Sequence, residues 1–292
     1  MSLATMRNNI LRFCPGLNPD IISSIIQDSY RQLGLMEWNR LELIRQISTV
    51  APYSTGTVTI DYLGTVTGVG TTFIPEMVGR HMRVHYSDSI FEISSVASAT
   101  ELALRNWTGE VIAAATAFTI FKIIYAADTS LSQIFNVAYQ TSLDKKSQDF
   151  FSRRDPARTT TGSPTWWAFA GYNTGGYPNI EIYPVPDQIY PLRLYGKMAI
   201  PTLTDVDTPY LPEDLVESHA LISCFRAKQA MDPSGQWGER IREQSPHYAE
   251  IFASAKDDDN RLGSHRDKVK DYMDVMELYP ASDSFWAAHD VE

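Results

Sequence analysis

Residues 64–73 read GTVTGVGTTF and hold three glycines and four threonines in ten positions. A glycine-rich stretch can wrap a phosphate, but a dinucleotide-binding fingerprint needs G-x-G-x-x-G between a strand and a helix. Here Phe73 stands where the third glycine belongs, more strand-like sequence follows, and the Gly-Lys-Ser/Thr of a P-loop is missing. The stretch therefore predicts a turn in a threonine-rich β-hairpin, with glycine chosen for positive φ.

The region from about residue 54 to residue 124 has a composition similar to that of this hairpin. Short runs rich in Val, Thr, Ile, Phe and Tyr alternate with Gly and Asn, which predicts strands and turns. Because the connections are short, the strands are expected to pair antiparallel, and a small closed barrel would remove exposed edges. The predicted strands are 57–63, 65–70, 81–86, 91–98, 101–106 and 117–125.

A helix is predicted before this β module. Residues 18–33 begin with Asn18 as a plausible N-cap and Pro19 at the first helical position, and their isoleucines recur on one face. The next segment, residues 38–50, predicts either a second helix or a helix that leads into a strand.

Two more helices are predicted in the last third of the chain. Residues 211–231 start with acidic residues and carry an apolar face. Residues 245–262 are expected to start with Ser245 as N-cap and Pro246 at the first helical position. The two apolar faces comprise Leu215, Val216, Ile222 and Phe225 in the first helix, and Tyr248, Ile251, Phe252, Ala255 and Leu262 in the second.

Residues 179–186 and 190–200 read as two strands of a hairpin joined at Asp187 and Gln188. The expected fold class is therefore α+β: a helical body with an inserted small antiparallel β-barrel module, an additional β-hairpin and a C-terminal extended arm. The expected domains are the first part of the helical body at 1–54, the β-barrel module at 55–124, the rest of the helical body at 125–274 with its hairpin at 179–200, and the arm at 275–292.

The composition describes a globular, acidic chain. It has 292 residues, 43% of them hydrophobic, and a formal net charge of −10, which argues against a protein that coats DNA through clustered Lys and Arg. The start MSLATMRNNILRF lacks the apolar run of a signal peptide, and no stretch approaches the length of a membrane span. We expect a soluble chain, with Cys14 and Cys224 as buried or idle thiols because they are far apart in sequence.

The patterns that suggest chemistry have simpler structural explanations. His81 and His85 have a metal-ligand spacing, but HMRVHY alternates like a strand and offers no third ligand, so surface histidines are favoured. Residues 257–259, three consecutive aspartates, are expected on a solvated helix face or a fraying end.

Asp205, Asp207 and Glu213 resemble the start of a calcium loop. Tyr210 occupies the position that requires glycine, and Val216 stands where the bidentate glutamate belongs. These acids therefore predict a turn and a helix N-terminus. No nucleophile elbow or catalytic cysteine context is present, so the chain is expected to be no enzyme and to use no cofactor or metal.

One cluster of basic residues stands out beside Phe150 and Phe151. A contact with an acidic protein neighbour is favoured over nucleic acid, because the surrounding sequence is acidic and rich in turns. The cluster consists of Lys145, Lys146, Arg153, Arg154 and Arg158.

Two segments resemble known proteins. TVTGVGTTFIPEMVGRHMRV (65–84), continuing into FEISSVASATELALRN (91–106), resembles the inserted β module of some phage neck proteins. IEIYPVPDQIYPLRLYGKMAIPTLTDVDTPYLPEDLVESHALISC (180–224) is similar to the closing half of head-to-tail adaptor proteins of tailed bacteriophages, the class that includes tail tubular protein A of short-tailed phages. In that class a Y-P-x-P-D hairpin leads to a polar loop and then to L-P-E/D at a helix start.

The resemblance implies a structural virion protein of the phage neck, made in the host bacterial cytoplasm. Such a protein docks as a ring, usually of twelve copies, under the portal, meets the nozzle, stopper or tail below, and lets DNA pass through its channel without specific binding. A C-terminal arm commonly reaches the portal. The candidate partner contacts are Met276, Tyr279, Phe285 and Trp286 in the arm, with Arg153, Arg154 and Arg158 in the basic cluster.

Two other readings stay open. A carbohydrate- or host-surface-binding tail module would stack sugars on Trp166, Trp167, Tyr172 and Tyr177, although paired tryptophans more often pack in cores or subunit contacts. An enzyme with a site assembled from distant residues has no positive support in the sequence.

Overall fold

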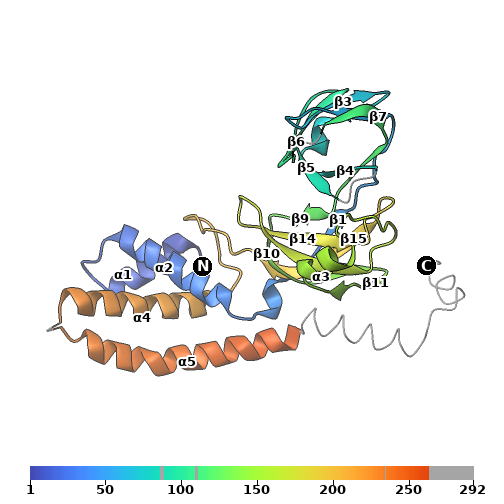
Figure 1. Cartoon of the computed structure of the whole chain (residues 1–292). Helices are drawn as coiled ribbons and strands as arrows, with labels where there is room; N and C mark the ends of the chain where they lie inside the picture. Colours follow the sequence, from blue (N-terminus) through green and yellow to red (C-terminus); the bar gives the residue numbers. More distant parts are fainter. Residues whose placement is uncertain (86–88, 109–110, 234, 263–292) are drawn as a thin grey trace, which may run out of the picture. The chain divides into compact units, whose positions relative to one another are not determined.

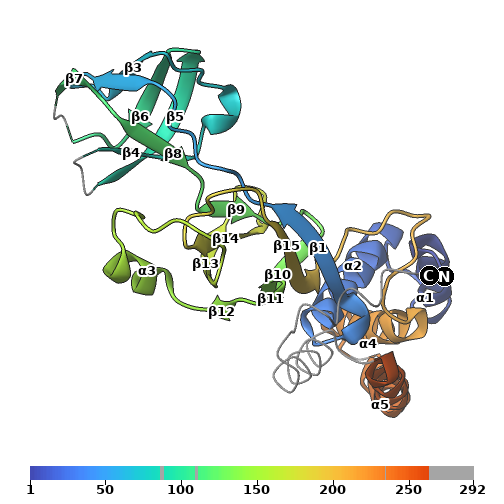
Figure 2. The same ribbon diagram turned by 90° about the vertical axis from the view of Figure 1, so that its right-hand side faces the viewer.

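The computed structural model describes residues 1–85, 89–108, 111–233 and 235–262. The chain divides into two compact units (Figures 1 and 2). Among the described residues, the first unit joins Met1–Leu43 to residues 197–262, and the second is Ile44–Gly196. Two segments far apart in the sequence thus build one unit, and the stretch between them builds the other as a single insertion.

The first unit is helical. Its elements are α1 (Leu3–Phe13), α2 (Pro19–Leu35), the 3-10 turn η1 (Asn39–Leu41), α4 (Glu213–Met231) and α5 (Trp237–Leu262). The Asn18 side chain accepts a hydrogen bond from the Asp20 N–H and Pro19 is at the first position, as the sequence predicts. Figure 1 shows α4 beside α5, with α1 and α2 against α4.

The predicted apolar face of α4 is confirmed, because Leu215, Val216, Ile222 and Phe225 are all buried. The predicted start of α5 is wrong. The helix begins at Trp237, Pro246 lies inside it, and the Ser245 hydroxyl donates to the carbonyl of Ile241 in place of capping a new helix. Packing on both sides of Pro246 outweighs its missing N–H, since Trp237 and Tyr248 both lie against the core.

A curled, seven-stranded sheet forms one part of the second unit. The strand order is β7-β2-β3-β6-β5-β4-β8, and the described pairs are antiparallel. The predicted closed barrel is corrected to a curled half-barrel whose end strands are β7 and β8. The strands are β2 (Thr57–Ile60), β3 (Thr65–Val69), β4 (His81–Val84), β5 (Ile90–Ser98), β6 (Glu101–Arg105), β7 (Ile112–Thr116) and β8 (Phe118–Phe121).

GTVTGVGTTF supplies β3 and the turns on either side of it. Gly64 and Gly70 have φ of 84° and 70°, so the predicted use of glycine for positive φ is confirmed at both ends of the strand. Glycine is required at position 68 for a different reason, because a Cβ there would lie 2.3 Å from Oγ1 of Thr71. The stretch is thus shaped by backbone geometry and close packing.

The predicted fold class is wrong, because the described part of the chain is mostly β-sheet and residues 125–200 do not continue a helical body. Two four-stranded sheets follow the half-barrel, in the orders β1-β15-β10-β11 and β12-β13-β14-β9. Their strands are β1 (Glu42–Ser48), β9 (Ile124–Ala126), β10 (Leu131–Tyr139), β11 (Thr141–Ser142), β12 (Asp144–Lys145), β13 (Trp166–Tyr172), β14 (Pro178–Tyr183) and β15 (Pro191–Met198).

The predicted hairpin at 179–200 is also wrong. Strand β14 pairs with β13 and β9, whereas β15 lies in the other sheet between β1 and β10. Pro184 and Pro186 have no N–H to donate, so β14 ends at Tyr183, and Val185 instead bridges Thr161. Residues 38–50 were expected to form either a second helix or a helix that leads into a strand. The structure is nearer to the second alternative, because a single 3-10 turn, η1, leads into strand β1.

Candidate functional site

The basic cluster of residues 145–158 surrounds the short helix α3 (Gln148–Arg154). The Ser147 hydroxyl accepts a hydrogen bond from the N–H of Phe150 and caps the helix start. Asp149 lies in the first turn, and Arg153 and Arg154 lie in the last turn, each where the helix dipole favours its charge. Local sequence therefore fixes two arginines at one helix end.

Three cations of this cluster lie over aromatic rings. Nζ of Lys145 is 5.1 Å from the centroid of the Trp167 ring, and Cζ of Arg154 is 4.9 Å from that of Trp166. Nζ of Lys146 is 5.9 Å from the ring centroid of Phe150. Aromatic faces attract cations, so the rings hold these side chains at defined places on the surface.

The rings themselves form a packed floor. Phe150 meets Trp166 edge to face with centroids 5.5 Å apart, and Trp166 stacks on Tyr183 at 5.6 Å. Phe151, which is fully buried, also stacks on Tyr183, with the two ring centroids 5.3 Å apart. These four rings form the aromatic layer between α3 and the sheet. Trp167 is also buried, but as the residue after Trp166 in β13 it points to the opposite side of the sheet.

Arg158 does not belong to the surface, which removes it from the predicted partner contacts. Its side chain is 6% exposed, and Nη2 and Nε donate to Oε1 of Glu181 at 2.8 and 3.1 Å. Its Nη1 donates to the carbonyls of Phe151 and Asp155. Glu181 is itself 3% exposed, so the two charges form a buried, hydrogen-bonded pair.

The carboxylate of Asp155 also stabilises the loop that follows α3, because it accepts hydrogen bonds from Thr159 and Thr160. Burial alone would raise the pKa of its carboxyl, but hydrogen bonds from Thr160 and Thr159 outweigh burial and hold the pKa below its usual range. Arg83 of strand β4 donates to the carbonyls of Ala157 and Arg158. The loop that follows α3 is thus tied down at its backbone and at its side chains.

The residues that remain at the surface are therefore Lys145, Lys146, Arg153 and Arg154. The Arg153 side chain is 81% exposed and forms an ion pair with Asp149 at 2.9 Å. The sequence identified these four cations but not the burial of Arg158, because only the fold shows that Glu181 lies opposite it. Met276, Tyr279, Phe285 and Trp286 lie outside the described residues.

The aromatic residues of the carbohydrate alternative do not form one exposed platform. Trp167 is 1% exposed, and Trp166 is half-buried between Arg154 and Tyr183. Tyr172 is exposed, and its ring contacts that of Phe169 at 5.1 Å. The tryptophan pair packs inward, as the general preference of such pairs predicts.

The predicted surface position of His81 is wrong. Its ring stacks on Phe121 at 6.3 Å and is half-buried. Burial lowers the pKa of His81, against the opposing effect of Glu92 and Glu181, while nearby Arg158 lowers it further. Among the described residues, no group of three or more His, Cys, Asp or Glu is placed to hold a metal ion.

The acids around residue 205 take the predicted structural roles. Asp207 accepts a hydrogen bond from the Thr204 N–H within a turn, and Glu213 lies in the first turn of α4. Asp205 pairs with Arg7 at 2.9 Å. The expectation for Asp259 is wrong, since it is 1% exposed and binds the backbone of η1, whereas Asp257 and Asp258 remain exposed.

Cys14 and Cys224, 210 positions apart, are neighbours in the helical core, and both are fully buried. A hydrogen bond from Cys224 lowers the pKa of Cys14, and the same bond raises that of Cys224. The sequence predicted buried thiols, which is confirmed, but their contact depends on α1 ending beside α4.

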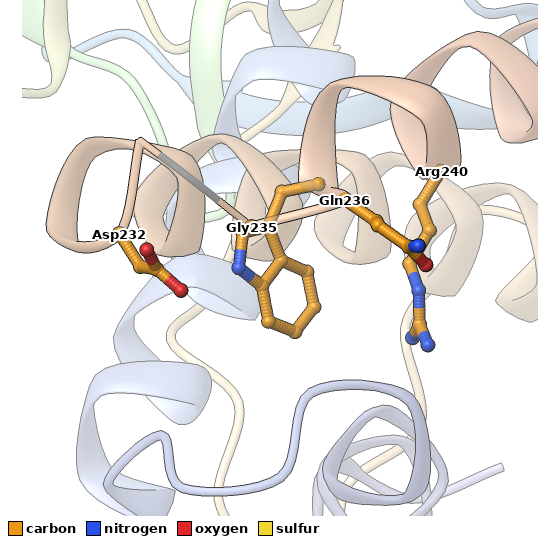
Figure 3. A pocket seen from close by; sticks show the side chains of 5 residues that line it. Asp232, Gly235, Gln236 and Arg240 are labelled. Atoms are coloured by element: carbon orange, nitrogen blue, oxygen red, sulfur yellow. The ribbon is translucent and has the colours of Figure 1, made fainter.

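The described residues also line small hollows. One pocket of about 210 Å³ lies where α4 gives way to α5, between Asp232, Gly235, Gln236, Trp237 and Arg240 (Figure 3). Cζ of Arg240 and Nζ of Lys228 lie 5.2 and 5.7 Å from the centroid of the Trp237 ring. Both cations thus contact the ring, and Arg240 also donates to the carbonyl of Phe13, so these groups already hold α5 against α1.

No protein-family model and no curated protein matches the chain. Within the described ranges, none of the helices is long and apolar enough to cross a membrane.

Proposed function

We propose that the chain is a structural virion protein, a head-to-tail adaptor of a tailed bacteriophage. It docks as a ring under the portal, joins the capsid to the tail and forms part of the DNA channel. The basis of the proposal is the resemblance of residues 65–106 and 180–224 to phage neck and adaptor proteins, in the order found in that class.

One structural observation supports the proposal best: the polar loop of the second resembling segment closes the helical unit. The carbonyls of Asp207 and Asp205 accept hydrogen bonds from the N–H groups of Leu3 and Ala4, at 3.1 and 3.3 Å. The loop then enters α4 at L-P-E, as the adaptor pattern requires. The resembling residues therefore have a defined role, since they tie the start of α1 to the loop that leads into α4.

The charge of the chain also suits a channel component. Its net charge of −10 would repel the DNA backbone, so DNA would pass without being held. Asp257 and Asp258 on α5 are exposed and add to this acidity. The exposed arginines of α3, Arg153 and Arg154, are then available for a contact with a protein neighbour.

The test is assembly on a portal. The purified full-length protein is expected to sediment as a monomer or a weak oligomer, and to form a ring visible in negative-stain images only after rings of the cognate portal protein are added. Stable rings in the absence of a portal would contradict docking-coupled assembly. Failure to bind the portal at any concentration would overturn the adaptor proposal itself.

A further inference from the structure

The surface cations on α3 and just before it form what we call the α3 basic face: Lys146, Arg153 and Arg154. Arg153 and Arg154 are exposed, and Lys146 is half-buried. Lys145 is not part of this face, because it lies over Trp167, which points to the opposite side of strand β13 from Trp166. Asp144 and Asp149 form ion pairs with Lys146 and Arg153. The face therefore keeps excess positive charge on a chain of net charge −10.

This face has an apolar component that a solvated charge cluster lacks. Phe150 is 36% exposed, and Trp166 beneath it is half-buried. Exposed ring edges between fixed cations offer a partner both ion pairs and apolar contact, which is typical of the residues that anchor protein interfaces. The partner that fits should be acidic and aromatic.

The C-terminal sequence of this chain has that composition. Residues 271–292 contain six carboxylate side chains and no Lys or Arg, and they also carry Tyr272, Tyr279, Phe285 and Trp286. Charge and ring content thus match those of the α3 basic face. Another long run without Lys or Arg, residues 198–225, has five acids but only Tyr210 and Phe225 as aromatic residues.

The chain that follows α5 is long enough to reach a neighbouring molecule. Thirty residues follow Leu262, the last residue of α5. Fully extended, thirty residues span about 100 Å, so the segment can extend to a neighbouring molecule. The contact also uses two different surfaces, and such head-to-tail interfaces generate closed rings when the rotation between copies closes.

We infer that residues 271–292 of one copy dock on the α3 basic face of a second copy and link neighbouring subunits. The inference rests on the ring of the proposed function and names its intersubunit contact. It assigns this contact to the C-terminal segment, for which the sequence resemblance alone implied the portal.

The first experiment measures the contact directly. A fluorescent peptide of residues 271–292 is titrated with the full-length protein, kept dilute enough to be monomeric, and its anisotropy is followed. Binding should weaken at least about tenfold between 50 and 300 mM salt, because the pairs are solvent-exposed and screened. A peptide with its six acids changed to Asn or Gln should bind at least about tenfold more weakly. No binding, or equal binding of both peptides, would overturn the inference.

Matched variants locate the site. Arg153→Glu with Arg154→Glu should reduce peptide affinity at least about tenfold. The control is Arg105→Glu with Arg193→Glu, because both residues are exposed on strands of the same unit and the change in net charge is identical. Equal loss in both variants would show a general charge effect and contradict the assignment. Tighter binding of a DNA duplex than of the peptide to the same face would overturn it as well.

Complementation tests whether the contact joins two copies. One full-length variant carries Arg153→Glu and Arg154→Glu, and the other carries the six neutralised acids in residues 271–292. At a concentration where the wild type self-associates, each variant alone should stay monomeric, but their mixture should form a dimer by light scattering. No dimer in the mixture would refute a contact between copies, while portal binding by the wild type would still leave the adaptor proposal standing.

Discussion

The carboxylate of Asp259, near the end of α5, accepts a hydrogen bond of 2.6 Å from the backbone N–H of Asn39, the first residue of η1. The other carboxylate oxygen accepts from the N–H and Nε of Arg40, at 3.0 and 3.1 Å. A side chain 220 positions away thus caps the turn that leads into β1. Its neighbours in the sequence, Asp257 and Asp258, are exposed and pair with Arg261.

Replacing Asp259 should therefore be costly. Asp259→Ala leaves two N–H groups and the Arg40 guanidinium without their acceptor, and we expect a loss of about 2–3 kcal/mol in the free energy of unfolding. The control Asp258→Ala should change it by less than about 0.5 kcal/mol, because that residue is exposed. Urea unfolding followed by circular dichroism measures both. Equal losses would show that Asp259 has no capping role.

The buried pair of Arg158 and Glu181 should be essential for stability. Arg158→Met leaves Glu181 as an unpaired buried charge and should cost about 3–5 kcal/mol. Arg153→Met, at an exposed arginine of the same cluster, should cost less than about 0.5 kcal/mol. The double variant Arg158→Met with Glu181→Leu should lose less than the sum of the single variants, because no charge is stranded. Additive losses would mean that the two side chains are not coupled.

Stability should decrease as the pH falls below 7. Burial lowers the pKa of His81 in the folded chain, so between the folded and unfolded pKa values the unfolded chain binds more protons. The loss should begin near pH ~7 and grow as the pH falls through ~6.5, the pKa of an unperturbed histidine. Burial also lowers the pKa of His219, so that residue adds to the slope.

His81→Phe should reduce this slope while keeping the stacking on Phe121. Urea midpoints at pH 7.5 and 5.5 measure the change, and the wild-type protein measured in parallel provides the reference slope. An unchanged slope in His81→Phe would show that His81 titrates alike in the folded and unfolded chain.

Gly64 should tolerate alanine less well than Gly171 does. Both have positive φ, 84° and 79°, so alanine at either site should cost about 1–2 kcal/mol through backbone strain. At Gly64 a Cβ would also lie 2.7 Å from Cβ of Trp107, whereas at Gly171 nothing lies within 4 Å. The overpacking should add about 1–3 kcal/mol at Gly64. Thermal unfolding of the two variants measures the difference, and equal losses would exclude the clash.

Strands and helices with strong local signals were predictable. The alternation of residues 57–106 predicted β2 through β6, because side chains of a half-buried strand point to opposite faces in turn. Asn18 and Pro19 predicted the start of α2 for an equally local reason. The same local reasoning failed at Ser245 and Pro246, which resemble a helix start, because packing on both sides carries α5 through them.

The partners of residues 125–200 could not be predicted locally. YPVPDQIYP suggests a hairpin turn, but β14 and β15 belong to different sheets, and pairing depends on strands far away in the chain. In the candidate site, Lys145, Lys146, Arg153 and Arg154 were predictable as surface cations, since charge clusters are usually solvated. Arg158 was not, because Glu181 enters only when β14 is placed beside α3 and β13.

The sequence by itself thus determined the features that depend on neighbours a few residues apart: the alternating strands of the half-barrel, the glycine turns at both ends of β3, the cap of α2 and the basic composition around α3. Only the tertiary structure decided which polar groups leave water. Asp259, Arg158 and the Cys14–Cys224 pair are buried because residues distant in the chain supply their hydrogen-bond partners, and desolvation of a polar group is tolerated only where such partners are in place.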